Sequence, residues 1–416
     1  MACSKPIRAP REWTKFMKEA TSPPEDKELF CLEEIINWAI ECELCDEHLV
    51  KKYSKKIRPY HLIRAIYPVI PDDTLCRELF KVFVHFALLL FIADDQMELQ
   101  SEEEMRNICA GFARLDDLSR ESFPEFHTVE EMKKIASQMS TPSIVGPTVF
   151  FANFVNEMAS VLLKHGNYAH DVVYDFRLRA SNMNSLYIQA VTIEKHKKKP
   201  RTLLENFWRH LFSGCAFPSH LLADVFSGAL GMTKQHIELI TEIYIYSSIF
   251  CMPVNDFFSY LREKAGNSDN MFRAILRESE ENIPEAAEKI AQIAEVALTC
   301  VYEKIQEALK RHPDIPELCS LFDYLSRCAL GWFWAHRFAV PRYQESTFKF
   351  TLVEVDDENL SSWLSEKRDY GDVVIKEIVE MVNTRMADGK MDALRGAFPI
   401  HKKVSAFKKD GLYEIE

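Results

Sequence analysis

The stretch "VHFALLLFIADDQMEL", residues 84–99, is almost entirely apolar until two adjacent aspartates appear near its end. Carboxylates at the end of an apolar helix are costly to bury unless a cation compensates them. Asp94 and Glu98 are four residues apart and therefore share one face of a helix, with Asp95 beside them. The stretch predicts a core helix that ends in a cluster of three carboxylates.

The composition favours an all-α fold, a single large helical bundle. Of the 416 residues, 47% are hydrophobic and only 12 are glycine, which allows a sizeable core built from helices. Apolar residues recur at helical spacing, with short polar or proline breaks between the segments. The helices expected on this basis span residues 28–44, 74–99, 101–113, 128–139, 147–165, 168–195, 201–213, 218–231, 233–265, 283–311 and 314–338.

The organisation along the chain suggests three parts. Residues 1–27 are rich in proline and charge and predict an extended N-terminal strap. Residues 28–345 carry the succession of helices. After Tyr343 the sequence changes to a short alternating stretch and one amphipathic helix, so we expect 346–416 to form a C-terminal extension packed on the bundle.

Charge and cysteine usage limit the partners and the compartment. The net charge of −12 disfavours nucleic acid or an anionic membrane as the main partner, since either would require a basic face. The longest apolar run, 86–93, is too short to span a bilayer, and residues 1–13 lack a signal-peptide core. The eleven cysteines include one CxxC pair, Cys42 and Cys45, without a second pair at zinc-binding distance. We therefore expect reduced thiols in a cytoplasmic protein without stable membrane insertion.

The carboxylates Asp94, Asp95 and Glu98 offer the hard oxygen ligands that suit Mg²⁺. This ion keeps several waters and takes further oxygens from a phosphate-bearing substrate. Taken alone, an adjacent aspartate pair is also common on a solvated helix face. The apolar run before it is what favours the metal site.

A second set of oxygen ligands follows in "CMPVNDFFSYLREKAG", residues 251–266. Asn255, Ser259 and Glu263 lie at successive intervals of four residues and form one stripe on a helix. An amide oxygen, a hydroxyl and a carboxylate on one line can chelate a second Mg²⁺, with Arg262 close enough to reach the same phosphate. An ordinary amphipathic helix is the alternative for this stretch alone.

The two motifs together resemble class I terpene synthases of the microbial type. The resemblance covers roughly residues 75–345 and implies an α-helical bundle of that type, in which both motifs face one cavity. The implied reaction is cyclisation of a prenyl diphosphate with Mg²⁺, three ions per active site. "PRTLLENFWRHLFSG", residues 200–214, is similar to the family segment that carries a diphosphate-sensing arginine, which would be Arg209. "VPRY" supplies Arg342 and Tyr343, the C-terminal pair that the resemblance assigns, with Arg262, to diphosphate binding.

The chemistry requires a dry pocket whose aromatic faces stabilise a carbocation. Phe91 lies one turn before Asp95 and is expected to face that cavity. Of Trp332 and Trp334, just ahead of the Arg342–Tyr343 pair, one is expected to line it. Plain core packing is the alternative for each of these rings.

The sequence departs from the family pattern in three places. Glu98 replaces an aspartate, Phe212 stands between Arg209 and Gly214 where polar residues are frequent, and the C-terminal extension is long. The length of the chain and the animal-like character of its sequence suggest a further resemblance to coral terpene cyclases.

The coral resemblance favours geranylgeranyl diphosphate as the substrate, with farnesyl diphosphate as the alternative. A prenyl chain-elongating synthase would require a second aspartate-rich motif, and a protonation-initiated cyclase would require D-x-D-D. A catalytically silent helical binding protein is a further alternative. The sequence leaves the oligomeric state open, a homodimer included.

Overall fold

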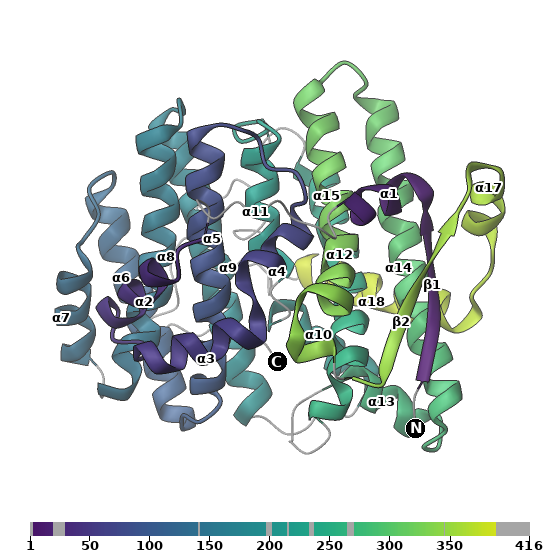
Figure 1. The fold of residues 1–416 in the computed structure, drawn as a ribbon, viewed down its shortest axis with the longest axis horizontal. Coiled ribbons are helices and arrows are strands. Elements are labelled where there is room, and N and C mark those ends of the chain that lie inside the picture. The colour runs from purple at the N-terminus through teal and green to yellow at the C-terminus, as the bar shows by residue number, and fades with distance from the viewer. Residues whose placement is uncertain are drawn as a thin grey trace. The chain divides into compact units, whose positions relative to one another are not determined.

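The computed structural model describes residues 3–19, 30–139, 142–196, 202–213, 216–232, 237–263, 270–344 and 346–387. Helices dominate these residues, and the strands among them form one two-stranded sheet (Figure 1). The predicted all-α class is confirmed. No helix within the described ranges is long and apolar enough to cross a membrane.

The chain folds as two compact units. One takes its described residues from Glu25–Ile63, Ile70–Lys197 and Met386–Glu416, the other from Met1–Pro24, Arg64–Val69 and Lys198–Arg385. The strand near the N-terminus and the strand after residue 345 both belong to the second of these units. The boundaries expected at residues 27 and 345 stay predictions.

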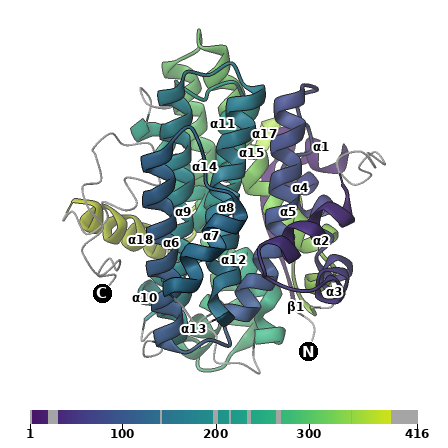
Figure 2. The ribbon, with the colours of Figure 1, turned by 90° about the vertical axis from the view of Figure 1, so that its left-hand side faces the viewer.

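The unit that holds the aspartate pair is a bundle of helices. Its core is built by α5, α6, α8 and α9, which pack along one another, and Figure 2 shows α6, α8 and α9 side by side. The bounds are α2 (Leu32–Glu41), α3 (Glu47–Ile57), α4 (Pro59–Ile66, which runs into the other unit), α5 (Thr74–Met97), α6 (Glu102–Ser122), α7 (Val129–Met139), α8 (Pro142–His165) and α9 (His170–His196).

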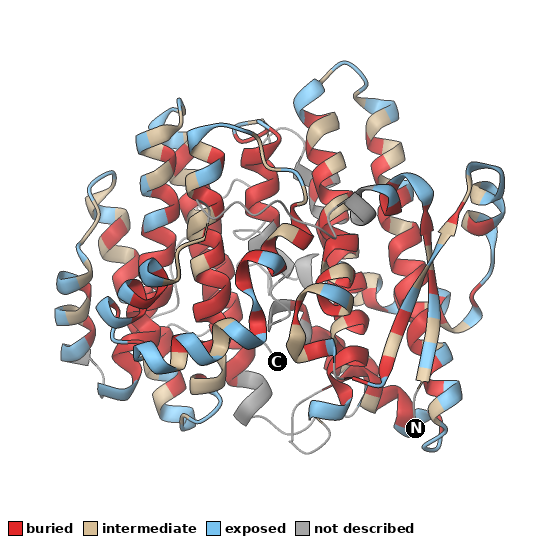
Figure 3. Ribbon diagram, viewed as in Figure 1, coloured by how far each residue is buried: buried red, intermediate tan, exposed pale blue. Residues whose placement is uncertain are grey.

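Helix α5 begins at a defined cap and is buried for most of its length (Figure 3). The side chain of Asp73 accepts a hydrogen bond from the Cys76 backbone N–H at 2.8 Å, which satisfies a donor of the first turn. Further along, Phe86 stacks on Phe154 of α8 with ring centroids 3.7 Å apart. This packing anchors the helix whose last turn carries Asp94 and Asp95.

The other unit combines helices with the small sheet. Strand β1 (Cys3–Pro10) pairs in parallel with β2 (Phe348–Val355), with Cys3 opposite Phe348, and Figure 1 shows the two strands side by side. Its helices are α1 (Arg11–Glu19), α10 (Leu203–Ser213), α11 (Ala216–Phe226), α12 (Ile237–Glu263), α13 (Met271–Glu278), α14 (Ile283–Arg311), α15 (Pro316–Trp334), α16 (Pro341–Gln344), α17 (Asp357–Ser365) and α18 (Asp369–Ala387), with a π-helical turn, η3 (Ala335–Ala339), after α15.

The sheet rests on α12 through aromatic side chains. Phe350 of β2 stacks on Phe257 of α12 with ring centroids 4.5 Å apart. Phe348 meets the same ring edge-on at 5.6 Å. The alternating apolar stretch predicted after residue 346 is therefore a strand whose inward face packs on the helix that carries Asn255.

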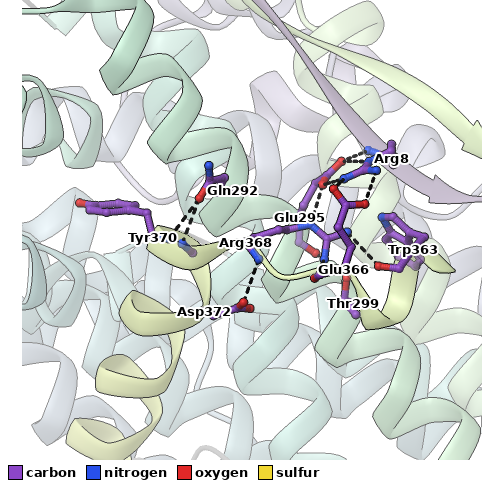
Figure 4. A network of polar contacts seen from close by, with 10 residues as sticks. Arg8, Gln292, Glu295, Thr299, Trp363, Glu366, Arg368, Tyr370 and Asp372 are labelled. Atoms are coloured by element: carbon purple, nitrogen blue, oxygen red, sulfur yellow. Dashed lines mark hydrogen bonds and ion pairs between the residues drawn. The ribbon is translucent and has the colours of Figure 1, made fainter. Parts of the chain in front are cut away.

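A buried carboxylate, Glu295 of α14, joins the sheet to the C-terminal segment (Figure 4). Its side chain is 8% exposed and forms an ion pair with Arg8 of β1 at 2.8 Å and another with Arg368 at 2.8 Å. Arg8 also pairs with Glu366 at 2.6 Å. Two arginines thus supply the positive charge that a buried carboxylate requires.

Backbone contacts extend this network along the segment that links α17 to α18. The guanidinium of Arg368 donates to the carbonyl oxygen of Trp363 at 3.1 Å, and its backbone N–H donates to Asp372 at 2.9 Å. The backbone N–H of Tyr370 donates to Gln292 of α14 at 3.2 Å (Figure 4). Ion pairs and hydrogen bonds together therefore hold residues that are far apart in sequence on α14.

Glu295 is expected to make stability depend on acidity. Burial by itself raises the pKa of Glu295, but hydrogen bonds from Arg8 and Arg368 outweigh it and lower the pKa below the usual 4.5. A carboxylate with a lowered folded-state pKa stabilises the protein above its unfolded pKa, and this stability is lost as pH falls through the folded value. The free energy of unfolding should therefore decline below pH 4.5.

The substitution Glu295→Gln should lower the free energy of unfolding at neutral pH by about 3 kcal/mol, since it leaves two arginines without their buried counter-charge. It should also flatten the decline at acidic pH. Urea unfolding across this pH range measures both effects, with Glu358→Gln at an exposed position of α17 as the control. A Glu295→Gln protein as stable as wild type at neutral pH would contradict the role assigned to the network.

Candidate active site

Three carboxylates gather where α5 ends. One ligand oxygen from each of Asp94, Asp95 and Glu98 lies within 4.8 Å of the others, a spacing that can hold a metal ion. Asp94 and Asp95 are half-buried, and Glu98, the residue that caps the helix, is exposed. The predicted cluster is thus present as a geometric arrangement.

The position of this cluster on the helix makes a cation favourable. The carboxyl end of an α-helix carries partial negative charge, because the last carbonyl groups have no partner within the helix. The last turn of α5 contains no basic residue. Three carboxylates therefore add charge to an end that is already negative, and a divalent ion would relieve the repulsion.

Two tyrosines from other helices orient the aspartates. The hydroxyl of Tyr187 in α9 donates to Oδ1 of Asp94 at 2.7 Å, and the hydroxyl of Tyr53 in α3 donates to Oδ2 of Asp95. A hydroxyl donor fixes a carboxylate without neutralising its charge. Partners of this kind fix metal ligands in position and tune their affinity. Nothing in the sequence marked either tyrosine, because each meets its aspartate only through the tertiary fold.

The second set of oxygens lies on α12. Asn255, Ser259 and Glu263 follow one another along this helix at the predicted spacing. Ser259 is 1% exposed, and its Oγ has no hydrogen-bond partner among the described residues. A buried hydroxyl left in that state is costly, whereas coordination to a hard cation satisfies it. The donor set therefore fits Mg²⁺.

The carboxylate of Glu263 is held in place from two sides. It accepts hydrogen bonds from Arg262 at 2.8 Å and from Nδ2 of Asn270 at 2.8 Å. The Arg262 guanidinium also lies over the ring of Tyr343, 5.8 Å from its centroid. The end of α12 thus brings together three of the predicted residues, Glu263, Arg262 and Tyr343.

Asn255 contacts residues that follow α15. Its Nδ2 lies 3.0 Å from Nε2 of His336 in the π-helical turn η3 and donates to the hydroxyl oxygen of Tyr343 at 3.4 Å. Burial lowers the pKa of His336 to about 4. Burial also raises the pKa of Tyr343, which keeps its hydroxyl protonated. His336 was not singled out from the sequence.

The remaining predicted residues are placed as follows. Phe91 is half-buried one turn before Asp95, Trp332 lies beside His336 with ring centroids 6.0 Å apart, and Trp334 packs on Phe338 at 4.3 Å. Arg342 begins the short helix α16 with Pro341. The backbone of Arg209 lies in α10, while its side chain and Gly214 lie outside the described residues.

Residues 85–299 match the family described as terpene synthase family 2, C-terminal metal binding. This match covers more than half of the chain and spans both sets of oxygen ligands. The chain belongs to terpene synthase family 2. It is accordingly a terpene synthase with the class I fold, and the metal-binding domain implies a divalent metal ion.

Solved structures agree on the fold. A linalool/nerolidol synthase from Streptomyces clavuligerus, in complex with 2-fluorogeranyl diphosphate, superposes with a TM-score of 0.53 at 14% identity, covering 80% of this chain and 98% of its own. A mutant of the SVS_A2 protein from ancestral sequence reconstruction gives 0.52 at 12% identity, covering 88% and 98%. No curated protein sequence matches the chain.

The contact between Tyr187 and Asp94 can be tested by removing one oxygen atom. Tyr187→Phe should raise the Mg²⁺ concentration required for half-saturation by about 10-fold, because Asp94 loses the donor that orients it. Calorimetric titration of Mg²⁺ in the presence of inorganic diphosphate measures this. Tyr174→Phe makes the same change on the same helix, where the ring packs on Phe123 instead. Equal affinities for the two variants would argue against an orienting role.

Proposed function

We propose that this terpene synthase is a Mg²⁺-dependent cyclase that converts a prenyl diphosphate, geranylgeranyl diphosphate, into a diterpene and releases diphosphate. The observation that carries the proposal is the donor chemistry of the two ligand sets. One set gathers three carboxylates at a helix end with no basic residue in its last turn. The other includes a buried hydroxyl with no partner among the described residues.

In this proposal the two sets serve one substrate. Three Mg²⁺ ions would be held by two sets of side chains. One set is at the end of α5, Asp94, Asp95 and the capping residue Glu98, and the other is on α12, Asn255, Ser259 and Glu263. When bound, these ions act as Lewis acids on the diphosphate oxygens and so favour ionisation of the substrate.

Cationic and hydroxyl side chains would bind the leaving group. Arg209, Arg262 and Arg342 would donate hydrogen bonds to diphosphate oxygens, for which the planar guanidinium is well shaped. Burial raises the pKa of Tyr343, so its hydroxyl stays protonated and can donate a hydrogen bond to the same diphosphate oxygens. The allylic carbon–oxygen bond breaks with its electron pair leaving on diphosphate.

The carbocation that remains must be kept from water. Phe91 and Trp332 are the aromatic residues that we assign to the cavity wall, because one precedes Asp95 by a turn and the other lies beside His336. Trp334 packs on Phe338, so we assign Trp334 a smaller contribution to the cavity wall. Loss of a proton to the departed diphosphate would complete the hydrocarbon and balance the reaction.

The choice of substrate rests on the resemblance to coral terpene cyclases, which favours the twenty-carbon chain. Farnesyl diphosphate, with a sesquiterpene product, is the alternative. The linalool/nerolidol synthase that shares the fold holds a fluorinated geranyl diphosphate, so its ligand belongs to the same chemical class. We further propose that the enzyme acts in the cytoplasm, where the free thiols among the described residues would stay reduced.

Incubation of the purified full chain with each prenyl diphosphate in Mg²⁺ buffer tests this proposal. Gas chromatography with mass spectrometry of the extract should show a twenty-carbon hydrocarbon from geranylgeranyl diphosphate, and inorganic diphosphate should accumulate in equal amount. A chelator should abolish both. A fifteen-carbon product alone would move the substrate to farnesyl diphosphate, and a longer prenyl diphosphate would indicate chain elongation instead.

Variants then test the residues. Asp94→Ala and Asn255→Leu should each lower turnover by about 100-fold or more, because each removes an oxygen that the proposal assigns to a metal ion. Asp72→Ala, in the exposed aspartate pair that precedes α5, is the matched control and should keep wild-type turnover. Full turnover by both site variants would refute the assignment.

A further inference from the structure

The π-helical turn after α15 places a histidine against the proposed metal ligand Asn255. Helix α15 ends at Trp334, and residues Ala335–Ala339 continue as a π-helical turn. Such turns insert one extra residue into a helix and are frequent at functional sites. His336, the second residue of this turn, is 2% exposed.

The hydrogen bonds of His336 determine which ring nitrogen carries the proton. Nδ1 lies 2.7 Å from the carbonyl oxygen of Trp332, and a carbonyl can only accept, so Nδ1 must be the donor. In the neutral imidazole Nε2 is then an acceptor. It faces Nδ2 of Asn255 at 3.0 Å, a group that can only donate.

These contacts also fix the orientation of the Asn255 amide. Nδ2 carries two hydrogens, and two acceptors are present, Nε2 of His336 and the hydroxyl oxygen of Tyr343 at 3.4 Å. With both hydrogens directed to this side, Oδ1 points the other way. Only the oxygen of an amide can bind Mg²⁺, and rotation of the amide by half a turn would present hydrogens to the ion.

We propose that His336 is a positioning residue that holds the amide of Asn255 with its oxygen toward the divalent metal. The ring is kept in place by its hydrogen bond to the carbonyl of Trp332 and by the tilted ring of Tyr343, whose centroid is 4.3 Å away. The π-helical turn therefore links the Arg342–Tyr343 segment to the metal motif of α12. This inference rests on the proposed function, since it assigns Asn255 to the metal.

The test compares substitutions that keep the shape of the ring or keep the acceptor. His336→Phe keeps a planar ring but removes Nε2, and should raise the Mg²⁺ concentration for half-saturation by about 10-fold. His336→Gln retains an acceptor oxygen at nearly the same distance from the backbone, so its Mg²⁺ concentration for half-saturation should be close to that of the wild type. Calorimetry with Mg²⁺ and inorganic diphosphate gives these values without turnover.

A matched control excludes a general effect of losing a buried imidazole. His220 in α11 is 1% exposed and stacks on Tyr244, so His220→Phe makes the same exchange elsewhere in the same unit. It should leave Mg²⁺ binding unchanged. Thermal unfolding should show that both phenylalanine variants are folded.

A second background separates positioning from packing. A carboxylate has two equivalent oxygens, so its binding to a metal ion does not depend on which of them faces the ion. In an Asn255→Asp background, His336→Phe should therefore weaken Mg²⁺ binding by less than about 3-fold, whereas a packing role would give the same loss in both backgrounds. Equal losses, or no loss in the Asn255 background, would overturn the inference. Absence of Mg²⁺-dependent diphosphate binding by the wild type would instead overturn the proposed function.

Discussion

The negative charge at the carboxyl end of α5 is the constraint on which the proposed chemistry depends. Asp94 and Asp95 occupy the last turn of a largely buried helix, and Glu98 caps it. The partial charge of the helix end has the same sign as theirs. A cation shared by the three carboxylates would relieve this repulsion, as the proposed function requires.

Two buried carboxylates away from the proposed metal site, those of Asp116 and Glu295, form ion pairs with arginine. Asp116, 2% exposed in α6, forms an ion pair at 3.0 Å with Arg177 of α9, which is itself 1% exposed. Glu295 is likewise held between Arg8 and Arg368. Arginine brings a permanent positive charge to each of these carboxylates. At Asp94 and Asp95, tyrosine hydroxyls from α9 and α3 donate to the carboxylates, contacts that would orient them toward a metal ion.

The sequence predicted the parts of the site whose geometry is local. Helical spacing alone placed Asp94, Asp95 and Glu98 together, and the structure brings their oxygens within 4.8 Å. The same spacing aligned Asn255, Ser259 and Glu263 on α12. That these residues bind metal stays a prediction, as do the roles of Arg209, Arg342 and the aromatic rings. The helical class and the terpene synthase family are confirmed.

What the sequence could not predict depends on contacts between distant segments. Tyr53 and His336 reach Asp95 and Asn255 across 42 and 81 residues, and no local pattern marks such partners. The pairing of β1 with β2 joins Cys3 to Phe348. The alternating stretch after residue 346 indicated one strand. Its partner strand is in the N-terminal segment, whose prolines had indicated only an extended strap.

The central claim is that the oxygens of α5 and α12 bind the same metal-bound diphosphate. A crystal structure of the protein with Mg²⁺ and inorganic diphosphate tests it most directly. We expect one diphosphate whose Mg²⁺ ions are ligated on one side by Asp94 and on the other by Asn255, Ser259 and Glu263. A diphosphate bound through only one of these sets, with the other far from any metal ion, would contradict the account.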